Sequence, residues 1–596
     1  MNILLTAINA KYIHSNLAVY SLRACAGEYR DAVELAEYTI NNQKDYILEE
    51  LYKRRPDVLC FSCYIWNIDY VTDIAREYKK LCPSVPIWVG GPEVSYEVEA
   101  FLRENPYIDG VMIGEGEDTF RELCGYYAHK RKLSDIAGIA FRKKSADGKA
   151  GEIVFTSPRP IKNMSEIPFC YDTLDDFSNR IIYYESSRGC PFSCSYCLSS
   201  VDKTLRFRDT EIVKRELKFF IDQKVPQIKF VDRTFNCNHA HAMELWRFIK
   251  ANDNGVTNFH FEISADLLNQ EELELISDMR PGLIQLEIGV QSTNEVTIKE
   301  IHRTMKLERL KEVVRLIQSG NNIHEYLDLI AGLPYEDYDS FGRSFDEIYE
   351  LKPNQLQLGF LKVLKGSYMF EHATEYGIVY HDKPPYEVMS TKWLSFDDVI
   401  KIKRVEEMLE VYYNSGQFEI TMKLMECIFD SAFEFFQELG DFYEANGYFG
   451  MSHSRIRRCE ILLEFLALYL HGCDSDDMAS VGLSGNAGDR DNTDFDENAQ
   501  IYKMIQESLI FDLYYRENCK SRPVWATDIG SFKHMTHAYC KNGKLSHVEP
   551  FHYIFPDKHT RKLDELPKYH KEPVWALFHY DMRDPLDHQA LVEYVE

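Results

Sequence analysis

Short apolar runs alternate with amphipathic stretches along the first part of the chain. Ile3–Ala7, Val58–Phe61, Ile87–Val89 and Val111–Ile113 have the length of buried strands, and stretches such as Tyr70–Leu81 between them have helical periodicity. This alternation predicts βαβ units and a parallel sheet. The first run has no basic lead, cleavage site or membrane-spanning length, so we expect a buried first strand in a cytoplasmic protein.

A second strand–helix rhythm occupies the middle of the chain, and a different pattern follows it. Helix-periodic stretches rich in Phe, Leu and Tyr come next, then a run of Ser, Asp, Asn and Gly, then strand-like pieces. The expected middle strands are Ile181–Glu185, Gln227–Val231, Asn258–Ile263, Leu283–Val290, Glu325–Ile330 and Gln355–Leu361. The later helical stretches are Ile400–Tyr413, Met422–Leu439 and Ile456–Leu470, and the last strand-like pieces are Val548–Phe555 and Pro573–Tyr580.

These patterns divide the 596 residues into several units, because one hydrophobic core does not grow to that size. We predict a first α/β domain, a linker, a second α/β domain, a helical domain, a flexible linker and a C-terminal α+β extension. Their expected ranges are 1–135, 136–167, 168–375, 376–475, 476–498 and 499–596.

Composition narrows the classes of function. The formal net charge of −27 repels phosphate backbones, which argues against bulk nucleic-acid binding. We expect no membrane attachment either. The 15 cysteines are an odd number without a secretory signal, which argues against a disulfide framework and for a reducing compartment.

Three cysteines stand out by their spacing. Cys190, Cys194 and Cys197 form a C-x3-C-x2-C array that can place three thiolates on three irons of one [4Fe–4S] cluster. The fourth iron then keeps an open coordination position for a small molecule, as catalytic metals do. The alternatives are a zinc site or three unrelated core thiols, but no fourth Cys or His follows at a zinc-ribbon distance.

The array, with Arg188-Gly189 before it and Tyr196 inside it, resembles the radical S-adenosylmethionine (SAM) superfamily. Upstream, Gly90-Gly91 and the Gly114-Glu115-Gly116-Glu117 segment resemble the B12-binding domain of the cobalamin-dependent class. The resemblance implies an α/β fold class: a Rossmann-like cobalamin-binding domain plus a partial (β/α)6 radical SAM barrel, followed by a mainly helical C-terminal region. That region resembles a C-terminal extension of some B12-type radical SAM proteins.

The resemblance also implies three cofactors, namely a [4Fe–4S] cluster, SAM and cobalamin, together with anaerobic surroundings and a flavodoxin- or ferredoxin-like electron donor. SAM contacts are expected at the carboxyl ends of the barrel strands. Asp232 stands where many family members carry a Gly-Gly-Glu segment, and Asp328 opens a segment that resembles the adenine-contact segment. The predicted SAM-binding residues are Tyr196, Asp232, Glu262, Glu287, Gln291, Arg303, Ile330 and Gly332.

Cobalamin is expected at the carboxyl edge of the first sheet, where glycines let the backbone approach a ligand closely. His14 follows the first strand, where other B12 proteins carry a D-x-H-x-x-G cobalt ligand, but Tyr12 and Leu17 replace the Asp and the Gly. A loop or capping role is favoured for His14 over cobalt ligation. The alternative is a domain that has lost its cofactor. The predicted residues are His14, Ser62, Gly90, Gly91, Gly114, Glu115, Gly116 and Glu117.

The expected function is a radical SAM enzyme that cleaves SAM reductively and methylates an unreactive carbon with methylcobalamin. Cobalamin-assisted cyclisation or rearrangement, and a non-catalytic Fe–S/cobalamin-binding module, are the alternatives. No motif assigns the substrate, a catalytic residue or the role of the C-terminal region. His534, His537 and Cys540 have a spacing that could hold a metal, although surface or capping roles are favoured.

The cysteine array generates the first testable prediction. Anaerobically prepared protein should be brown and contain about four irons per chain, because three thiolates suffice for one cluster. Cys194→Ala should lose the iron, as measured by iron analysis and absorption. Full iron content and activity in the triple Cys→Ala variant would contradict the assignment.

Overall fold

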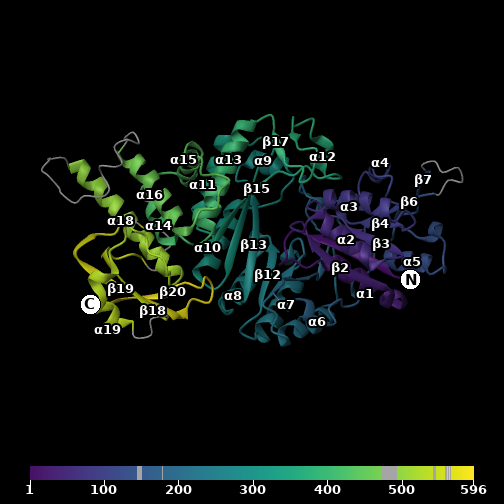
Figure 1. Cartoon of the computed structure of the whole chain (residues 1–596), viewed down its shortest axis with the longest axis horizontal. Coiled ribbons are helices and arrows are strands. Elements are labelled where there is room, and N and C mark those ends of the chain that lie inside the picture. The colour runs from purple at the N-terminus through teal and green to yellow at the C-terminus, as the bar shows by residue number, and fades with distance from the viewer. Residues whose placement is uncertain are drawn as a thin grey trace.

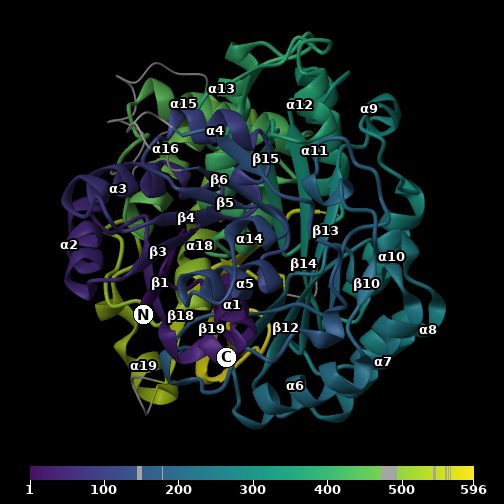
Figure 2. The ribbon, with the colours of Figure 1, turned by 90° about the vertical axis from the view of Figure 1, so that its right-hand side faces the viewer.

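The computed structural model describes residues 1–143, 151–177, 179–471, 493–540, 545–556, 560, 563 and 565–595. The first domain lies at one end, the barrel in the middle and the C-terminal region at the other end (Figure 1). In the view turned by 90°, the first domain lies in front of the barrel (Figure 2). Within the described ranges, no helix is long and apolar enough to span a bilayer.

The first domain is built on a seven-stranded sheet in the order β2-β1-β3-β4-β5-β6-β7. Strands β1 to β5 are parallel, as predicted, and apolar residues pack on both faces of the sheet. The strands are β1 (Ile3–Asn9), β2 (Val33–Thr39), β3 (Val58–Ser62), β4 (Ile87–Gly90), β5 (Gly110–Met112), β6 (Ile139–Arg142) and β7 (Ile153–Phe155). The helices are α1 (Leu17–Cys25), α2 (Lys44–Arg54), α3 (Ile68–Leu81), α4 (Val98–Glu104) and α5 (Glu117–Tyr127).

Three strands of this sheet were not predicted. The edge strand β2 is only partly buried, so its sequence alternates instead of forming an apolar run. Strands β6 and β7 lie in residues 136–167, which were predicted to be a linker. They are short and join the sheet through antiparallel pairing, with Phe141 opposite Gly110. The first domain therefore extends to Phe155.

The barrel is an open six-stranded sheet in the order β15-β14-β13-β12-β11-β8, with every neighbouring pair parallel. Each predicted strand is present with its bounds shifted by at most one residue. The strands are β8 (Ile182–Tyr184), β11 (Gln227–Phe230), β12 (Asn258–Ile263), β13 (Ile284–Gln291), β14 (His324–Ala331) and β15 (Gln355–Phe360). The helices between them include α6 (Thr210–Asp222), α7 (His239–Ala251), α8 (Gln270–Ser277), α9 (Glu295–Glu300), α10 (Leu307–Ser319) and α11 (Tyr338–Tyr349).

Side chains alternate strictly along the central barrel strands. In β13 and β14, buried residues alternate with partly exposed ones. The buried set is mostly apolar and packs in one core with residues of the surrounding helices, such as Leu245 and Val313. The partly exposed set includes Glu287 and Asp328 on the inner face. The helices thus cover the outside of the barrel and leave its inside polar.

The C-terminal region is mainly helical before it ends in a small sheet. The stretch Met422–Leu439 forms two helices instead of one, because Ser431 accepts a hydrogen bond from Glu434 N (3.0 Å) and caps a new helix there. The helices are α12 (Tyr368–His372), α13 (Phe396–Leu409), α14 (Glu419–Met425), α15 (Ala432–Ala445), α16 (Arg455–His471), α18 (Thr493–Arg516) and α19 (Lys533–Tyr539). The strands are β16 (Val379–Tyr380), β17 (Val388–Ser390), β18 (Ser546–Tyr553), β19 (Tyr569–Arg583) and β20 (Ala590–Val595).

The linker predicted at 476–498 lies mostly outside the described residues, and its last part, from Thr493 on, belongs to α18. The predicted strands near Val548 and Pro573 are β18 and β19. They form an antiparallel sheet with β20, which the sequence pattern did not reveal.

The first domain meets the open barrel beside both of its edge strands. Next to β8, Ile181 N donates to Ile13 O (2.8 Å), and His14 forms a bridge with Ile181. Beyond β15, the Tyr386 hydroxyl donates to Glu93 in the loop after β4. The carboxyl-edge loops of the first sheet therefore lie across the opening between β8 and β15.

Candidate cluster and cofactor site

The cysteine array forms a loop between two very short strands, β9 (Ser187–Arg188) and β10 (Arg206–Phe207), which pair antiparallel. Gly189 begins the loop with φ +90°, and a Cβ there would lie 2.6 Å from Thr204 O. Only glycine suits this position, because its positive φ and the close backbone both exclude a side chain. The predicted Arg-Gly signature thus has a local structural cause.

The three thiols are arranged differently from the ligands of a single ion. Cys190 and Cys194 are buried and Cys197 is more exposed. No group of three or more His, Cys, Asp or Glu residues in the described part of the chain is placed to hold one metal ion. A [4Fe–4S] cluster binds each thiolate to a different iron, so its thiolates lie farther apart than ligands of one zinc. The donor set and the open loop suit a cluster.

The loop is fixed at its middle and near two of its three thiols. Ser195 N donates to Ile301 O (2.9 Å), and Met369 N donates to Ser195 O (2.9 Å). The Cys190 thiol lies 3.9 Å from the Thr234 hydroxyl, and Arg303 donates to Cys194 Sγ at 3.8 Å. The loop is therefore held by the barrel and by the start of the C-terminal region.

A cavity of about 140 Å³ opens beside this loop at the carboxyl ends of the barrel strands. Its walls combine Cys194 with carboxylates, amides and guanidinium groups, which suits a ligand that carries both charges and hydroxyls. The predicted SAM residues that line it are Glu262, Glu287, Gln291 and Arg303. Asp328, which opens the segment that resembles the adenine-contact segment, also lines the cavity. Residues that the sequence analysis did not assign line it as well, namely Phe192, Arg233, Thr234, Ser264 and Thr304.

Two acidic residues in this cavity differ in their electrostatics. Glu287 lies 2.8 Å from Lys229 Nζ and 2.9 Å from His260 Nε2. Burial works to raise the pKa of Glu287, but His260 and Lys229 outweigh it and hold the pKa at about 2. Burial, with Glu287 and Glu262 nearby, raises the pKa of Asp328 to about 8, and its Oδ1 has no hydrogen-bond partner. Asp328 therefore presents an unpaired acceptor to a ligand.

Asp232 accepts hydrogen bonds from the segment that enters the cluster loop. It is buried, does not line the cavity, and accepts hydrogen bonds from Ser186 N (2.9 Å), Ser186 Oγ (2.7 Å) and Ser187 Oγ (2.5 Å). Burial raises the pKa of Asp232 to about 7. Its side chain therefore orders the backbone that enters the cluster loop.

The remaining predicted SAM residues lie around the cavity. Arg303 donates to the Tyr196 hydroxyl at 3.3 Å, so Tyr196 supports the arginine. Ile330 is on the inner face of β14, and Gly332 follows that strand with φ +87°. A Cβ on Gly332 would lie 2.6 Å from Val388 Cγ1 in β17. The C-terminal region therefore packs directly on the predicted adenine-contact segment.

The predicted cobalamin residues gather at the carboxyl edge of the first sheet. Asn16 donates to Ser62 Oγ (3.3 Å) beside the end of β3. Gly91 has φ +121°, and a Cβ there would lie 2.4 Å from Cys63 O, whereas Gly114 has no heavy atom within 4 Å of its Cβ position. The space at Gly114 allows a ligand to approach the backbone closely, whereas Gly91 is required because a side chain there would clash with the backbone of Cys63.

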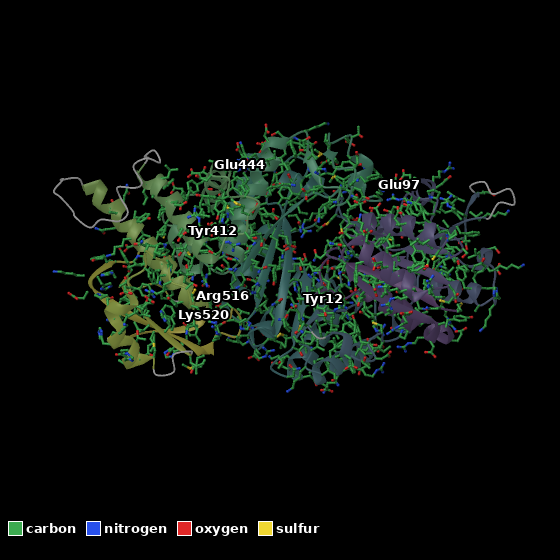
Figure 3. All side chains as sticks on the ribbon, viewed as in Figure 1. Tyr12, Glu97, Tyr412, Glu444, Arg516 and Lys520 are labelled. Carbon is green, nitrogen blue, oxygen red and sulfur yellow. The ribbon has the colours of Figure 1, made fainter. Side chains whose placement is uncertain are left out.

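His14 faces the barrel. Its Nδ1 lies 2.7 Å from the Tyr183 hydroxyl, and burial together with Lys11 and Lys229 lowers the pKa of His14. Tyr12 of the same loop lies at the boundary between the first domain and the barrel, far from Arg516 and Lys520 (Figure 3). This geometry is consistent with the loop role favoured for His14, because its Nδ1 atom contacts Tyr183 across the domain boundary.

Glu115 and Glu117 point their carboxylates at the cluster loop. Glu117 lies 2.8 Å from Arg188 Nη2, and Glu115 lies 2.5 Å from Arg206 Nη1. A ligand at this edge would therefore meet the backbone of Gly114 and Gly116 more readily than these side chains. The sequence pattern could not reveal this, because the arginines come from another domain.

A stacked aromatic pair at the same edge was also missed. The rings of Tyr64 and Trp66 lie 4.4 Å apart at an interplanar angle of 7°, just after β3. The Trp66 side chain is 41% exposed while its Nε1 donates to Ile8 O (3.1 Å). An exposed but fixed aromatic surface therefore adjoins Ser62, and the nearby Y-x-W pattern was its signal in the sequence.

Comparison with protein families identifies the two α/β units. A B12 binding domain model matches residues 3–124, and a Radical SAM superfamily model matches residues 184–348. A third model, described as "Protein of unknown function (DUF4080)", matches residues 374–589. The chain thus contains the predicted B12-binding and radical SAM domains, which are the domains that bind cobalamin, a [4Fe–4S] cluster and SAM.

Individual proteins agree with these matches. The cobalamin-dependent radical SAM methyltransferase TokK of Streptomyces tokunonensis is 27% identical over 350 residues, which are 55% of this chain and 49% of TokK. The anaerobic magnesium-protoporphyrin IX monomethyl ester cyclase of Rubrivivax gelatinosus is 23% identical over 344 residues, 55% of this chain and 60% of the cyclase. The chain therefore spans about half the length of such relatives.

The fold has solved counterparts. The structure of the cobalamin-dependent SAM radical enzyme OxsB, with aqua-cobalamin and SAM bound, superposes with a TM-score of 0.54 at 15% sequence identity. The match covers 86% of this chain and 80% of OxsB. At that identity the likeness concerns the fold, and it confirms the predicted α/β fold class over most of the chain.

The raised pKa of Asp328 predicts a pH dependence of SAM binding. Below about pH 8 the carboxyl group is largely neutral, so SAM, a cation, should bind more tightly as the pH rises toward about 9 and the carboxylate forms. The gain should not exceed roughly tenfold per pH unit. Equilibrium dialysis of cluster-loaded protein measures it. Asp328→Asn is the control and should have a smaller pH dependence than the unmodified protein, whereas identical profiles would place the ammonium and sulfonium of SAM elsewhere.

The contact between Tyr386 and Glu93 predicts a stability effect. Tyr386→Phe should lower the urea midpoint of the first unfolding transition, because Glu93 loses its hydrogen-bond donor at a partly buried position. The cost should be roughly 1–3 kcal/mol. Tyr380→Phe removes a hydroxyl from the same hairpin and serves as the matched control. Equal midpoints for the two variants would show that the contact does not hold the domains together.

Proposed function

We propose that this chain is a cobalamin-dependent radical SAM enzyme that cleaves SAM reductively and methylates an unreactive carbon. One observation carries the proposal. The cavity beside the three-cysteine loop lies at the carboxyl end of the barrel, and the carboxyl-edge loops of the B12-binding domain contact that same loop. The predicted sites of the three cofactors therefore adjoin one another.

When bound, the reduced cluster supplies an electron to SAM, and cobalamin supplies a methyl group. The chain's own residues orient and separate the reacting parts. Arg303 can pair with a carboxylate, and its guanidinium is held by Tyr196 and by the Gly289 carbonyl. Glu262 and Asp328 present oxygen atoms to cationic and hydroxyl groups, and Glu287 lines the same cavity while paired with Lys229 and His260. The loops of the first domain cover the opening of the barrel and limit the entry of water.

The polar groups on the inner face of the barrel indicate which class of substrate fits the site. Lys229, Glu287 and His260 form a connected polar group, and the ring of Tyr326 stacks on His260 with centroids 5.3 Å apart. The buried His324 Nε2 has no hydrogen-bond partner. We propose that the substrate is polar and hydrogen-bonds to this face, because an apolar molecule would leave His324 Nε2 without a partner and would desolvate the charged Lys229–Glu287 pair.

The electron donor remains the predicted flavodoxin- or ferredoxin-like protein. Pro191 and Ser193 of the cluster loop are exposed, and Lys203 donates to Ser193 Oγ at 3.1 Å beside them. We propose that the donor docks over this edge, since it is where the cluster loop reaches the surface.

Cobalamin-assisted cyclisation or rearrangement is the second candidate. The similarity to an anaerobic cyclase, which extends over 344 residues, supports this candidate. A binding module without turnover is the third possibility, and the same experiment separates all of them.

The test is a product assay with cluster- and cobalamin-loaded protein, SAM and a reductant. Methyl transfer should release 5′-deoxyadenosine and S-adenosylhomocysteine in comparable amounts, whereas cyclisation should release the first without the second. Arg303→Lys should keep the iron yet reduce SAM cleavage by roughly tenfold or more, because lysine cannot form a bidentate pair. Absence of both products from the unmodified protein, with candidate substrates from its genomic neighbourhood, would favour the binding module.

A further inference from the structure

Two arginines face each other at the base of the cluster loop. Arg188 of β9 and Arg206 of β10 are direct cross-strand partners, and all three cysteines lie in the loop between them. Like charges directly opposite one another destabilise an antiparallel pair. These two strands have two residues each, so few backbone hydrogen bonds oppose the repulsion. The facing arginines therefore require negatively charged partners to stay paired at the base of the loop.

The barrel supplies part of that charge. Glu185 lies 2.8 Å from Arg188 Nη2, and Asp202 lies 2.9 Å from Arg206 Nη2. Asp202 is 44% exposed, so solvent weakens its attraction. Neither acid reaches both arginines in these contacts.

The first domain supplies the carboxylate that does. Glu115 lies 2.5 Å from Arg206 Nη1 and 3.5 Å from Arg188 Nη1, so it bridges the two arginines. Glu117 adds a second contact to Arg188 at 2.8 Å, and its side chain is only 7% exposed. Such partly buried pairs respond more strongly to the loss of one partner than surface pairs do.

The glycines beside these acids make the approach possible. Gly114 has φ +75°, which turns the chain between β5 and α5. A Cβ on Gly116 would lie 3.0 Å from Leu22 Cδ2, so a larger residue would press against α1. The Gly-Glu-Gly-Glu segment therefore carries two carboxylates to the domain boundary on a tight turn.

We propose that Glu115 and Glu117 are positioning residues that clamp the cluster loop onto the B12-binding domain. Glu115 neutralises the facing pair of Arg188 and Arg206, so the loop adopts its final shape only when the two domains are docked. One charge network then fixes the cluster loop relative to the carboxyl edge where cobalamin is expected. The inference rests on the proposed function only for the identity of the two cofactors.

The test uses the full chain loaded with cluster and cobalamin. Glu115→Gln should increase amide hydrogen exchange over residues 187–208 by about tenfold, because the loop opens locally when the arginine pair is not neutralised. The electron paramagnetic resonance signal of the reduced cluster should change, while the cobalamin content stays the same. Adding Arg206→Gln should restore slow exchange, since only Arg188 then remains and it keeps Glu117 and Glu185.

Asp118→Asn is the matched control. Asp118 follows Glu117 in the same helix, and its carboxylate pairs with Lys162 Nζ at 2.8 Å, whereas only the backbone of Lys162 contacts Glu115 and Arg206. It should leave the exchange of residues 187–208 and the cluster signal unchanged. If Glu115→Gln does not fold, a folded Glu115→Gln/Arg206→Gln variant supports the clamp, and an unfolded one contradicts it.

Other results would overturn the proposal. Unchanged exchange in Glu115→Gln with loss of cobalamin would make Glu115 a cofactor ligand, as the sequence first indicated. A double variant as fast in exchange as the single one would show that the facing arginines are not what Glu115 neutralises. These measurements require no turnover, so a protein that fails to cleave SAM could still confirm the clamp.

Discussion

An open parallel barrel leaves two edge strands that do not pair with each other, and in this protein the first domain lies across that opening. The domain contacts the barrel beside β8 through His14 and beyond β15 through Glu93. Parallel strands all present their carboxyl ends at one edge of a sheet, so the ligand-bearing loops of the first sheet lie together at the boundary. The relative placement of the predicted cofactor sites depends on this contact.

Charged side chains from both domains pair with one another at the domain boundary. Arg188 lies near acids from both of them, and Glu115 reaches both arginines at the base of the cluster loop. Within the barrel, Glu287 is satisfied by Lys229 and His260, whereas Asp328 is left with an unpaired oxygen. Some acidic residues of the site therefore pair with other side chains of the protein, whereas Asp328 keeps an oxygen atom that is available to a ligand.

The C-terminal region contacts the site, although it contains no sequence motif that indicates such a role. Val388 packs on Gly332, and Tyr386 reaches the loop after β4. Most of the region lies on the far side of the barrel from the first domain (Figure 1). The β16–β17 hairpin of this region therefore contacts both domains that carry the predicted cofactor sites.

The strands of the barrel, the cysteine loop and the places where glycine is needed could be predicted from local sequence pattern. These follow from local rules: side chains alternate along strands, helical periodicity separates them, and Gly189 is required where φ is positive and the backbone is close. In the first domain, the predicted strands are fully buried, whereas the missed strands β2, β6 and β7 are only partly buried.

The roles of the polar residues depend on partners that the fold brings together, so local pattern could not predict them. Asp232 was predicted to bind SAM, and in the fold it accepts hydrogen bonds from Ser186, which follows β8, and from Ser187 of β9. Glu115 and Glu117 carry the expected motif, yet their partners are arginines distant in sequence. A carboxylate has the same appearance in a sequence whether it binds a ligand or a neighbouring side chain, because its role depends on which charges the fold brings within a few ångströms.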